Sequence, residues 1–362
     1  MSVFKVEVVK LRVVPHPDAD ALELAHIEGY VAAVRKGEFH TGDLAVYIPE
    51  GAVVPHEVLV RMGLEGKLAG SQKNRVKAVR LRGVLSQGLV ASMKTLGIEA
   101  GEGEDVASRL GITKYEPPIP VAMGGEVFNA GREVTLDFDV ENWKSCPDLL
   151  REGEEVIFTE KLHGTCTIVG ILPYKDAHTE AFGEKKNIVI FSKGLGAKGL
   201  AFKNNERNKD NLYVRATRAL VARIDEVQRD NTDGVAVPNF ILGETFGPGV
   251  QDLTYGKAVG FRVFAAAYGY RGDQRYQNWS FVEGSLKAQF NFETVPVLYR
   301  GPFSVTAMRK HTDGRTMMGA DHIREGIVMI PASERTDQRI GRVCLKSVSA
   351  NYLTRKNGTE YN

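Results

Sequence analysis

A lysine that follows a strand-like run is the residue of this sequence best placed to act as a nucleophile. The run Glu155–Thr159 leads into Glu160 and Lys161, and the turn Leu162-His163-Gly164 comes next. A glycine after a strand end lets the backbone approach a ligand without a Cβ clash. An amine in this position can form a covalent intermediate once it has lost its proton. Taken alone, the segment also fits an ordinary solvated surface lysine.

Further polar residues lie at the ends of later strand-like runs. Glu244 follows Ile241-Leu242-Gly243, and Glu325 precedes Gly326–Ile330. Lys193 and Lys346 end two more runs, and Phe264 lies within Arg262–Ala266. Lys161, Glu244, Glu325 and Lys346 are separated by intervals of about 80, 80 and 20 residues. The order and the spacing of these segments carry more information than any one of them.

Together the segments resemble the six ordered motifs of the covalent nucleotidyltransferase superfamily, which includes ligases and RNA-capping enzymes. The resemblance implies that Lys161 attacks the α-phosphate of ATP, forms lysyl–AMP and releases pyrophosphate. AMP would then pass to a 5′-phosphate, and a 3′-OH would attack that activated end. The motif residues, from motif I through Ia, III, IIIa and IV to V, are Lys161, Lys193, Glu244, Phe264, Glu325 and Lys346.

The resemblance also implies roles around the nucleotide. Glu325 would hold Mg²⁺ or Mn²⁺, which both take oxygen ligands. Glu244 would accept hydrogen bonds from the ribose hydroxyls, and Phe264 would stack on the adenine ring. Either Ile327 or Val328 would line the opposite face of the base. The motif I neighbours expected to bind the nucleotide are Glu160, Leu162, His163 and Gly164.

The resemblance also implies that lysines contact the phosphates of ATP and of the RNA end. Lys346 would offset the charge that develops on the α-phosphate, and Lys193 would lie near the nucleotide or the 5′-phosphate. Motif V departs from the common K-x-K pattern, because Cys344 stands in place of the first lysine. Arg342, two residues earlier, is the candidate to supply that charge. His163 is expected to contact the ribose, to orient Lys161, or to serve as a structural turn histidine.

A narrower resemblance links the chain to the fifth family of RNA ligases. It rests on Phe138–Lys144, Pro147-Asp148 and Gly153-Glu154, which lead into Thr159–Thr165. His163, where most members of the superfamily have Asp or Asn, is compatible with that family and argues against DNA ligases and capping enzymes. The implied fold is α+β, with an N-terminal OB-fold barrel before a nucleotidyltransferase domain of antiparallel sheets and flanking helices. The implied function is ATP-dependent joining of 3′-OH and 5′-phosphate RNA ends, at nicks in duplexes.

The N-terminal third has a basic stretch that fits nucleic-acid binding. Pro15–Asp20 and Arg80–Leu89 are similar to the tRNA-binding OB modules of some aminoacyl-tRNA synthetases. No acidic residue occurs between Lys67 and Glu99. A basic strand face on a small barrel binds nucleic-acid backbones, and the scarcity of aromatic residues here favours phosphate contacts. A solvated face is the alternative. The candidate face consists of Lys73, Arg75, Lys77, Arg80 and Arg82.

Hydrophobic patterning indicates the elements that must position these residues. Short alternating runs predict a barrel of strands before residue 110. Later strand-like runs alternate with helical stretches, and an apolar stripe predicts a helix within Asp210–Arg229. We therefore expect an OB-fold module over 1–115, a linker over 116–130 and a nucleotidyltransferase domain over 131–362. The predicted barrel strands are Val3–Val14, Leu22–Gly29, Ala32–Lys36, Asp43–Pro49 and Lys73–Leu81.

Composition excludes several classes of protein. The 362 residues are 43% hydrophobic and 25% charged, with a net charge of +2, which is typical of a globular protein rather than a disordered one. Three scattered cysteines argue against a disulfide scaffold or a zinc ribbon. The motifs of P-loop NTPases, zincins, lipases and protein kinases are absent. Without a secretory or membrane-spanning segment, we expect a cytoplasmic monomer that binds RNA and neither a membrane nor a protein partner.

Three alternatives remain open at this point. A DNA ligase or a capping-type guanylyltransferase would use the same covalent lysine chemistry. An OB module joined to an inactive nucleotidyltransferase would bind RNA without catalysis. Retention of Lys161, Glu244, Glu325 and Lys346 argues against the inactive form.

Overall fold

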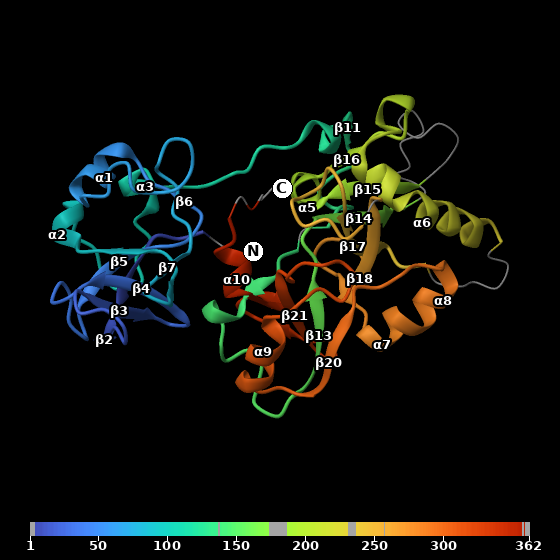
Figure 1. Cartoon of the computed structure of the whole chain (residues 1–362). Helices are drawn as coiled ribbons and strands as arrows, with labels where there is room; N and C mark the ends of the chain where they lie inside the picture. Colours follow the sequence, from blue (N-terminus) through green and yellow to red (C-terminus); the bar gives the residue numbers. More distant parts are fainter. Residues whose placement is uncertain are drawn as a thin grey trace.

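The computed structural model describes residues 4–136, 138–173, 187–230, 237–256, 258–356 and 358. An N-terminal part and a larger C-terminal part lie side by side, and an extended segment joins them (Figure 1). Among the described residues, no helix has the length and apolar character that crossing a bilayer requires.

The N-terminal part is a small set of antiparallel sheets around two apolar clusters. Val8, Val46 and Ile48 are fully buried in one cluster, and Ala25 and Ala32 are fully buried in the other. Short helices α1 (His56–Arg61), α2 (Met93–Leu96) and α3 (Ala107–Leu110) connect the strands. The paired strands are β1 (Glu7–Lys10), β5 (Leu44–Ile48) and β9 (Leu89–Ala91); β2 (Arg12–Pro15), β3 (Leu22–Ile27) and β4 (Tyr30–Arg35); β6 (Ala52–Val53) and β10 (Thr113–Lys114); and β7 (Val79–Leu81) and β8 (Val84–Ser86).

Two predicted strands differ from the structure. The run Val3–Val14 is divided at Leu11, which is buried between β1 and β2. Of the predicted strand Lys73–Leu81, only the last three residues form a strand, β7. Lys73 has a positive φ of 54°, which interrupts an extended chain.

The segment between the parts contains more structure than a linker. After the 3₁₀ turn η1 (Val121–Met123), strand β11 (Val127–Asn129) pairs with β16 (Leu200–Phe202) of the C-terminal part. The predicted linker 116–130 therefore ends in a strand that packs with the second domain.

Two five-stranded sheets form the C-terminal part. Their strands are antiparallel except for the parallel pair β12–β24. In the first sheet the order is β12 (Glu141–Asn142), β24 (Leu345–Val348), β21 (Gly326–Pro331), β13 (Glu155–Lys161) and β20 (Val297–Pro302). In the second it is β15 (Ile188–Ser192), β14 (Thr165–Ile171), β17 (Phe240–Phe246), β18 (Gly260–Tyr268) and β19 (Arg275–Tyr276). A two-stranded ribbon pairs β22 (Thr336–Asp337) with β23 (Gly341–Arg342).

Helices flank these sheets. The predicted helix is confirmed as α6 (Leu212–Arg229), and Leu220 and Ile224 of its apolar stripe are buried against the second sheet. The Asn211 side chain caps its first turn by accepting from the N–H groups of Tyr213 and Val214. The others are α5 (Lys193–Lys198), α7 (Trp279–Phe281), the π-helical η5 (Val282–Leu286), α8 (Lys287–Phe290), α9 (Val305–Thr312), α10 (Ala350–Leu353) and the 3₁₀ turns η2 (Trp143–Ser145) and η4 (Glu206–Asn208).

Candidate active site at the junction of two sheets

Lys161 stands where the chain crosses from one sheet to the other. It is the last residue of β13 in the first sheet, and after three residues the chain enters β14 in the second sheet. Lys161 lies opposite Gly326 of β21, and Thr159 lies opposite Val328, which in turn lies opposite Lys346 of β24. Because side chains alternate along a strand, these cross-strand partners put Thr159, Lys161, Val328 and Lys346 on one face of the sheet.

Lys161 forms an ion pair with Glu325, the residue just before the neighbouring strand β21. Its Nζ lies 2.7 Å from Oε1 of Glu325, and the two side chains are 26% and 11% exposed. Burial acts to lower the pKa of Lys161, but Glu325 and Glu244 outweigh it and raise that pKa. Burial acts to raise the pKa of Glu325, but Lys161 and His163 lower it to about 2. In this state the amine carries its proton and is not yet a nucleophile.

Glu244 supplies a second buried acid from the other sheet. Burial raises its pKa to about 8, against the lowering effect of Lys161. The backbone of Gly164 hydrogen-bonds to this carboxyl group. A Cβ on Gly164 would lie 2.2 Å from the carbonyl oxygen of Thr245 and 3.0 Å from Cγ of Glu244. Glycine is therefore required here for close approach to β17.

Two further lysines surround the pair. Lys346 has a pKa lowered by burial and by Lys161. Lys193, the first residue of α5, donates from Nζ to Oδ1 of Asp139 at 2.6 Å. The structure thus gathers the lysines and acids predicted from motifs I, III, IV and V around one point, with motif Ia bound to a neighbouring aspartate.

Apolar side chains from both sheets lie beside these charges. Phe264 of β18 and Val328 of β21 are partly buried and pack against one cluster between the two sheets. Phe264 also meets Phe138, with ring centroids 6.0 Å apart. Ile327 points to the other face of β21, where it is fully buried beside Phe158. Of the two residues proposed to face the base, the structure brings Val328 to the site and not Ile327.

Arg342 does not replace the missing lysine of motif V. Its side chain is 9% exposed and pairs with Glu334 through both its Nε and Nη2 atoms. The guanidinium also lies 4.3 Å from the centroid of the Tyr276 ring. Its charge is therefore neutralised within the fold, which corrects the expectation that it serves the phosphates.

The remaining motif I residues are buried. Leu162 is 3% exposed and packs in the cluster between the sheets, so its side chain is structural. Glu160 is 1% exposed, and its carboxylate accepts from the backbone N–H of Met317 at 2.7 Å. Its own N–H donates to the carbonyl of Pro296 at 2.8 Å. On strand alternation, Glu160 faces away from Lys161.

His163 is joined to residues that sequence reasoning did not identify. Its ring contacts Asp252 and Tyr352, and Arg355 lies beside them. Its backbone N–H donates to the hydroxyl of Tyr255 at 2.6 Å. These partners follow it by roughly 90 to 190 positions and form no local pattern, so no signal in the sequence marks them.

The carboxylates at this site could bind a divalent cation only if phosphate or water oxygens supplied its other ligands. Among the residues described, no group of three or more His, Cys, Asp or Glu side chains could enclose a metal. Mg²⁺ and Mn²⁺ take oxygen ligands, and Mg²⁺ keeps several waters and needs one or two carboxylates beside substrate phosphates. Glu325, with Glu244 near it, fits that requirement.

The predicted basic face of the N-terminal part is partly committed to internal contacts. Val76 and Ala78 are buried as expected, which leaves Arg75 and Lys77 on the outer side. The guanidinium of Arg75 stacks on the Tyr115 ring at 3.6 Å. Arg80 donates to Oδ1 of Asn351 in α10 at 3.0 Å. Lys73 is exposed in a turn closed by its N–H to the carbonyl of Gly70 at 3.1 Å, and Arg82 is exposed at the turn of the hairpin β7–β8.

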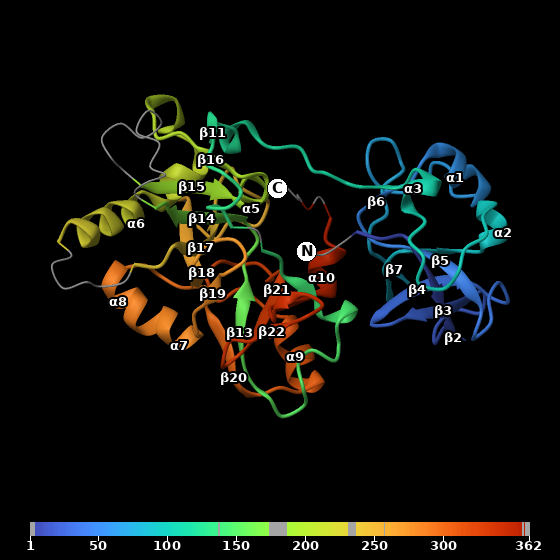
Figure 2. The same ribbon diagram turned by 180° about the vertical axis from the view of Figure 1, so that it is seen from behind.

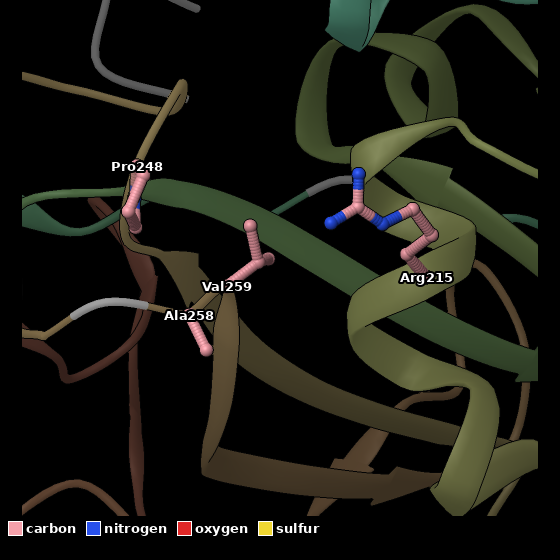
Figure 3. Close-up of a pocket in the computed structure, with 4 residues that line it drawn as sticks. All are labelled: Arg215, Pro248, Ala258 and Val259. Carbon is pink, nitrogen blue, oxygen red and sulfur yellow. The ribbon is translucent and has the colours of Figure 1, made fainter.

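A hollow of about 370 Å³ lies elsewhere on the surface. It is lined by Arg215 of α6 and by Pro248, Ala258 and Val259 from the β17–β18 connection. Figure 3 shows the Arg215 guanidinium pointing from the helix toward that connection. None of the predicted site residues lines it, so it is distinct from the junction around Lys161.

Two family models match this chain. A family described as RNA ligase matches residues 154–348, which include every motif residue discussed above from Lys161 to Lys346. A model described as an OB-fold domain matches residues 2–93. A search of curated proteins found no match.

Solved structures share the fold over nearly the whole chain. A mutant RNA ligase of Naegleria gruberi with ATP and Mn is 22% identical, with 96% of this chain and 98% of that chain covered and a TM-score of 0.73. The same ligase with pyrophosphate, and a mutant with AMP and Mn, are each 22% identical, with 97% and 98% covered and TM-scores of 0.75. The predicted α+β fold with an N-terminal OB-fold module is confirmed.

Proposed function

Because the chain belongs to the RNA ligase family, we propose that it uses ATP to join 3′-OH and 5′-phosphate ends of RNA at nicks in duplexes. The reaction proceeds through lysyl–AMP on Lys161 and then a 5′-adenylylated strand. The observation that carries the proposal is the Lys161–Glu325 pair of 2.7 Å at the sheet junction, with Glu244 and Lys346 around it. The N. gruberi ligase was solved with ATP and Mn, with AMP and Mn, and with pyrophosphate. ATP, Mn and pyrophosphate correspond to the substrate, the metal and the leaving product of such a first step, and AMP to the nucleotide that the last step releases.

In the first step Lys161 must lose its proton. A divalent cation bound with the triphosphate supplies positive charge that offsets the phosphate charges. Glu325 would turn its carboxylate toward that ion and release the Lys161 amine from its ion pair. Lys346 then favours the neutral amine, because a nearby cation lowers the pKa of a lysine. Nζ of Lys161 bonds to the α-phosphorus, the bond to the pyrophosphate oxygen breaks, and the amine proton leaves to water.

The other residues hold the nucleotide and its charge. Phe264 and Val328 offer apolar surfaces from opposite sheets for the adenine ring. Glu244, as an acid held largely protonated near pH 7, can both accept from and donate to ribose hydroxyls. Lys346 offsets charge on the α-phosphate in the transition state. Lys193 would leave Asp139 and bind the 5′-phosphate of the RNA end.

The N-terminal OB-fold module would bind the RNA backbone. Lys73, Lys77 and Arg82 are the cations we assign to phosphate contacts, while Arg75 and Arg80 also stabilise the fold. We further propose a cytoplasmic monomer. Cys146, Cys166 and Cys344 are all unpaired, which suits a reducing compartment.

Label transfer from α-³²P-ATP tests the first step. With Mg²⁺ or Mn²⁺, we expect label that stays on the denatured protein and is absent from Lys161→Ala. Lys161→Ala should still fold, with a lowered melting temperature, because the change leaves the nearly buried Glu325 carboxylate without its partner. It should still join a strand that is already adenylylated, because the last step does not consume the lysine.

The remaining outcomes separate the alternatives. Label from α-³²P-GTP in place of ATP would identify a capping-type guanylyltransferase. Sealing that is indifferent to a ribonucleotide at the 3′-OH would indicate a DNA ligase. Absence of label from protein freed of bound AMP would contradict catalysis and leave an RNA-binding protein.

A further inference from the structure

The ring of His163 is held on both of its nitrogens. Nε2 lies 2.7 Å from Oδ1 of Asp252, and Nδ1 lies 2.8 Å from the hydroxyl of Tyr352. A carboxylate only accepts, so the contact with Asp252 calls for a proton on Nε2, and Nη2 of Arg355 lies 3.2 Å from the same nitrogen. The ring is 4% exposed, and its two short contacts leave it a single orientation.

Arg355 braces both partners of the ring. Its Nε and Nη2 donate to the two oxygens of Asp252 at 3.0 and 2.9 Å, which is a bidentate pair. Its Nη1 donates to the carbonyl of Tyr352 at 2.9 Å, and its guanidinium lies 3.7 Å from the centroid of the Tyr352 ring. Asp252 and Tyr352 are therefore fixed relative to each other before either contacts His163.

The His163 ring lies directly beside the carboxylate of Glu325. Oε2 of Glu325 lies 3.7 Å from Nδ1 of His163, and its other oxygen lies 2.7 Å from Nζ of Lys161. The carboxylate is thus placed between the nucleophile and the imidazole. If the imidazole rotated or withdrew, the second oxygen of Glu325 would lose this neighbour and the carboxylate could turn away from Lys161.

The residues of this network come from two distant segments. Asp252 lies in the β17–β18 connection, where Gln251 also donates to the carbonyl of Gly164 at 3.2 Å. Tyr352 belongs to α10 and Arg355 follows it. Both segments therefore meet beside the motif I turn, where His163 is buried and Asp252 reaches the surface.

We propose that Asp252, Tyr352 and Arg355 are positioning residues that act through His163 to hold Glu325 opposite Lys161. This inference rests on the proposed function, in which Lys161 is the nucleophile. Partners that orient a residue in direct contact with a reacting group contribute on the order of 10–100-fold to activity. The C-terminal helix and the β17–β18 connection thereby acquire a role in the first chemical step.

The experiment compares Asp252→Asn and Tyr352→Phe with the wild-type full-length protein. We expect the rate constant of label transfer at saturating α-³²P-ATP and Mg²⁺ to fall on the order of 10–100-fold. The ATP concentration for half-maximal rate should stay close to that of the wild type, because the proposed role of both residues is to position His163 and not to bind the nucleotide. Asp273→Asn and Tyr299→Phe make the same chemical changes outside the network and should leave the rate unchanged.

A second background tests whether the effect passes through His163. Asn in place of His163 has an amide near the Nδ1 position and no atom at the Nε2 position. In His163→Asn, the further change Asp252→Asn should therefore lower the rate much less than it does in the wild type, because only its link to Tyr352 through Arg355 remains, whereas Tyr352→Phe should still lower the rate. Additive losses for Asp252→Asn in both backgrounds would overturn the proposal.

The outcomes distinguish this inference from the proposed function. If the wild type takes no label, the proposed function fails. If the wild type is labelled and Asp252→Asn and Tyr352→Phe react at its rate, the positioning role is wrong. A lowered melting temperature with an unchanged rate would likewise overturn it, because the network would then serve stability alone.

Discussion

The side chains around Lys161 are arranged so that its charge can be changed by what binds beside it. In the free protein Glu325 keeps the amine protonated, and Lys346 opposes that effect from the same sheet face. If Glu325 moves away from the amine, the effect of Lys346 dominates and the pKa of Lys161 falls. In the proposed function, the Lys161 amine is therefore held in its protonated form and becomes a nucleophile when Glu325 binds a metal ion in its place.

Glu244 gives a prediction for the pH dependence of stability. Burial raises its pKa to about 8 from 4.5, so between these values the folded protein holds a proton that the unfolded chain has lost. The free energy of unfolding must then fall as the pH rises through that window. Glu244→Gln cannot titrate, so the variant should gain stability relative to the wild type from pH 5 to pH 8.

Urea unfolding of both proteins at several pH values measures this difference. Histidines titrate in both proteins, so their effect cancels in the comparison. A difference that stays constant from pH 5 to pH 8 would show that Glu244 is ionised in the folded protein throughout.

At the scale of elements, the site depends on one strand-to-strand crossing. β13 ends at Lys161 in the first sheet and β14 begins at Thr165 in the second, so the motif I turn spans the gap between the sheets. The tightest point of that turn is Gly164 against β17. The position of the nucleophile relative to Glu244 is therefore set by backbone packing as well as by side chains.

Gly164→Ala should disturb this crossing. The new Cβ would lie 2.2 Å from the Thr245 carbonyl oxygen, so the turn must move. We expect a loss of stability of about 1–3 kcal/mol from overpacking, together with slower label transfer. Calorimetry and the α-³²P-ATP assay measure the two effects.

Gly194→Ala is the matched control for that substitution. A Cβ there meets nothing within 4 Å, and the residue lies in α5. Alanine should stabilise this helix by roughly 0.5–1 kcal/mol. Equal behaviour of the two variants would show that Gly164 has no special packing role.

At the scale of the whole molecule, the OB-fold module contacts the catalytic domain at the side where α10 lies. Figures 1 and 2 both show α10 between the two parts, with β7 facing it and α2 on the far side of the module. The contacts include the Gly29 N–H to the Lys144 carbonyl at 3.1 Å, Tyr30 to Ser145 at 2.9 Å and Arg80 to Asn351. RNA bound along the basic face would thus pass close to the catalytic domain.

Salt dependence tests the basic face. Lys77→Ala should weaken RNA binding and reduce the slope of log affinity against log salt by about one for the lost phosphate contact. Label transfer from ATP should be unchanged, because this residue lies outside the catalytic domain. Lys94→Ala, an exposed cation on α2, is the control. Identical slopes for the two variants would contradict the assignment of this face.

Gly29→Ala tests the contact between the domains. A Cβ at Gly29 would lie 2.7 Å from both Cα and the carbonyl oxygen of Lys144, so the domains must separate slightly. Small-angle scattering should show a larger radius of gyration, and sealing should slow while label transfer persists. Gly101→Ala, where a Cβ meets nothing within 4 Å, should change neither. An unchanged radius in Gly29→Ala would mean that this contact is not kept in solution.

Local patterns of residues were enough to predict several parts of this protein before its structure was known. The strand-like runs place Lys161 and Glu325 at strand ends, and the apolar stripe of α6 is visible as a helical period. Motif order and spacing sufficed to predict the α+β class with its N-terminal OB-fold and the RNA ligase family. The strand ends and the helix could be predicted because each is specified within a few neighbouring residues.

Contacts between side chains from distant segments could not be predicted and became visible in the folded protein. In Gly326–Pro331 nearly every residue is apolar, so alternation could not tell that Val328 rather than Ile327 faces the site. The pairing of Arg342 with Glu334 and the partners of His163 join residues by contacts with no periodic signal. Strand register and loop closure fix these contacts, and both are set by packing between segments far apart in the chain.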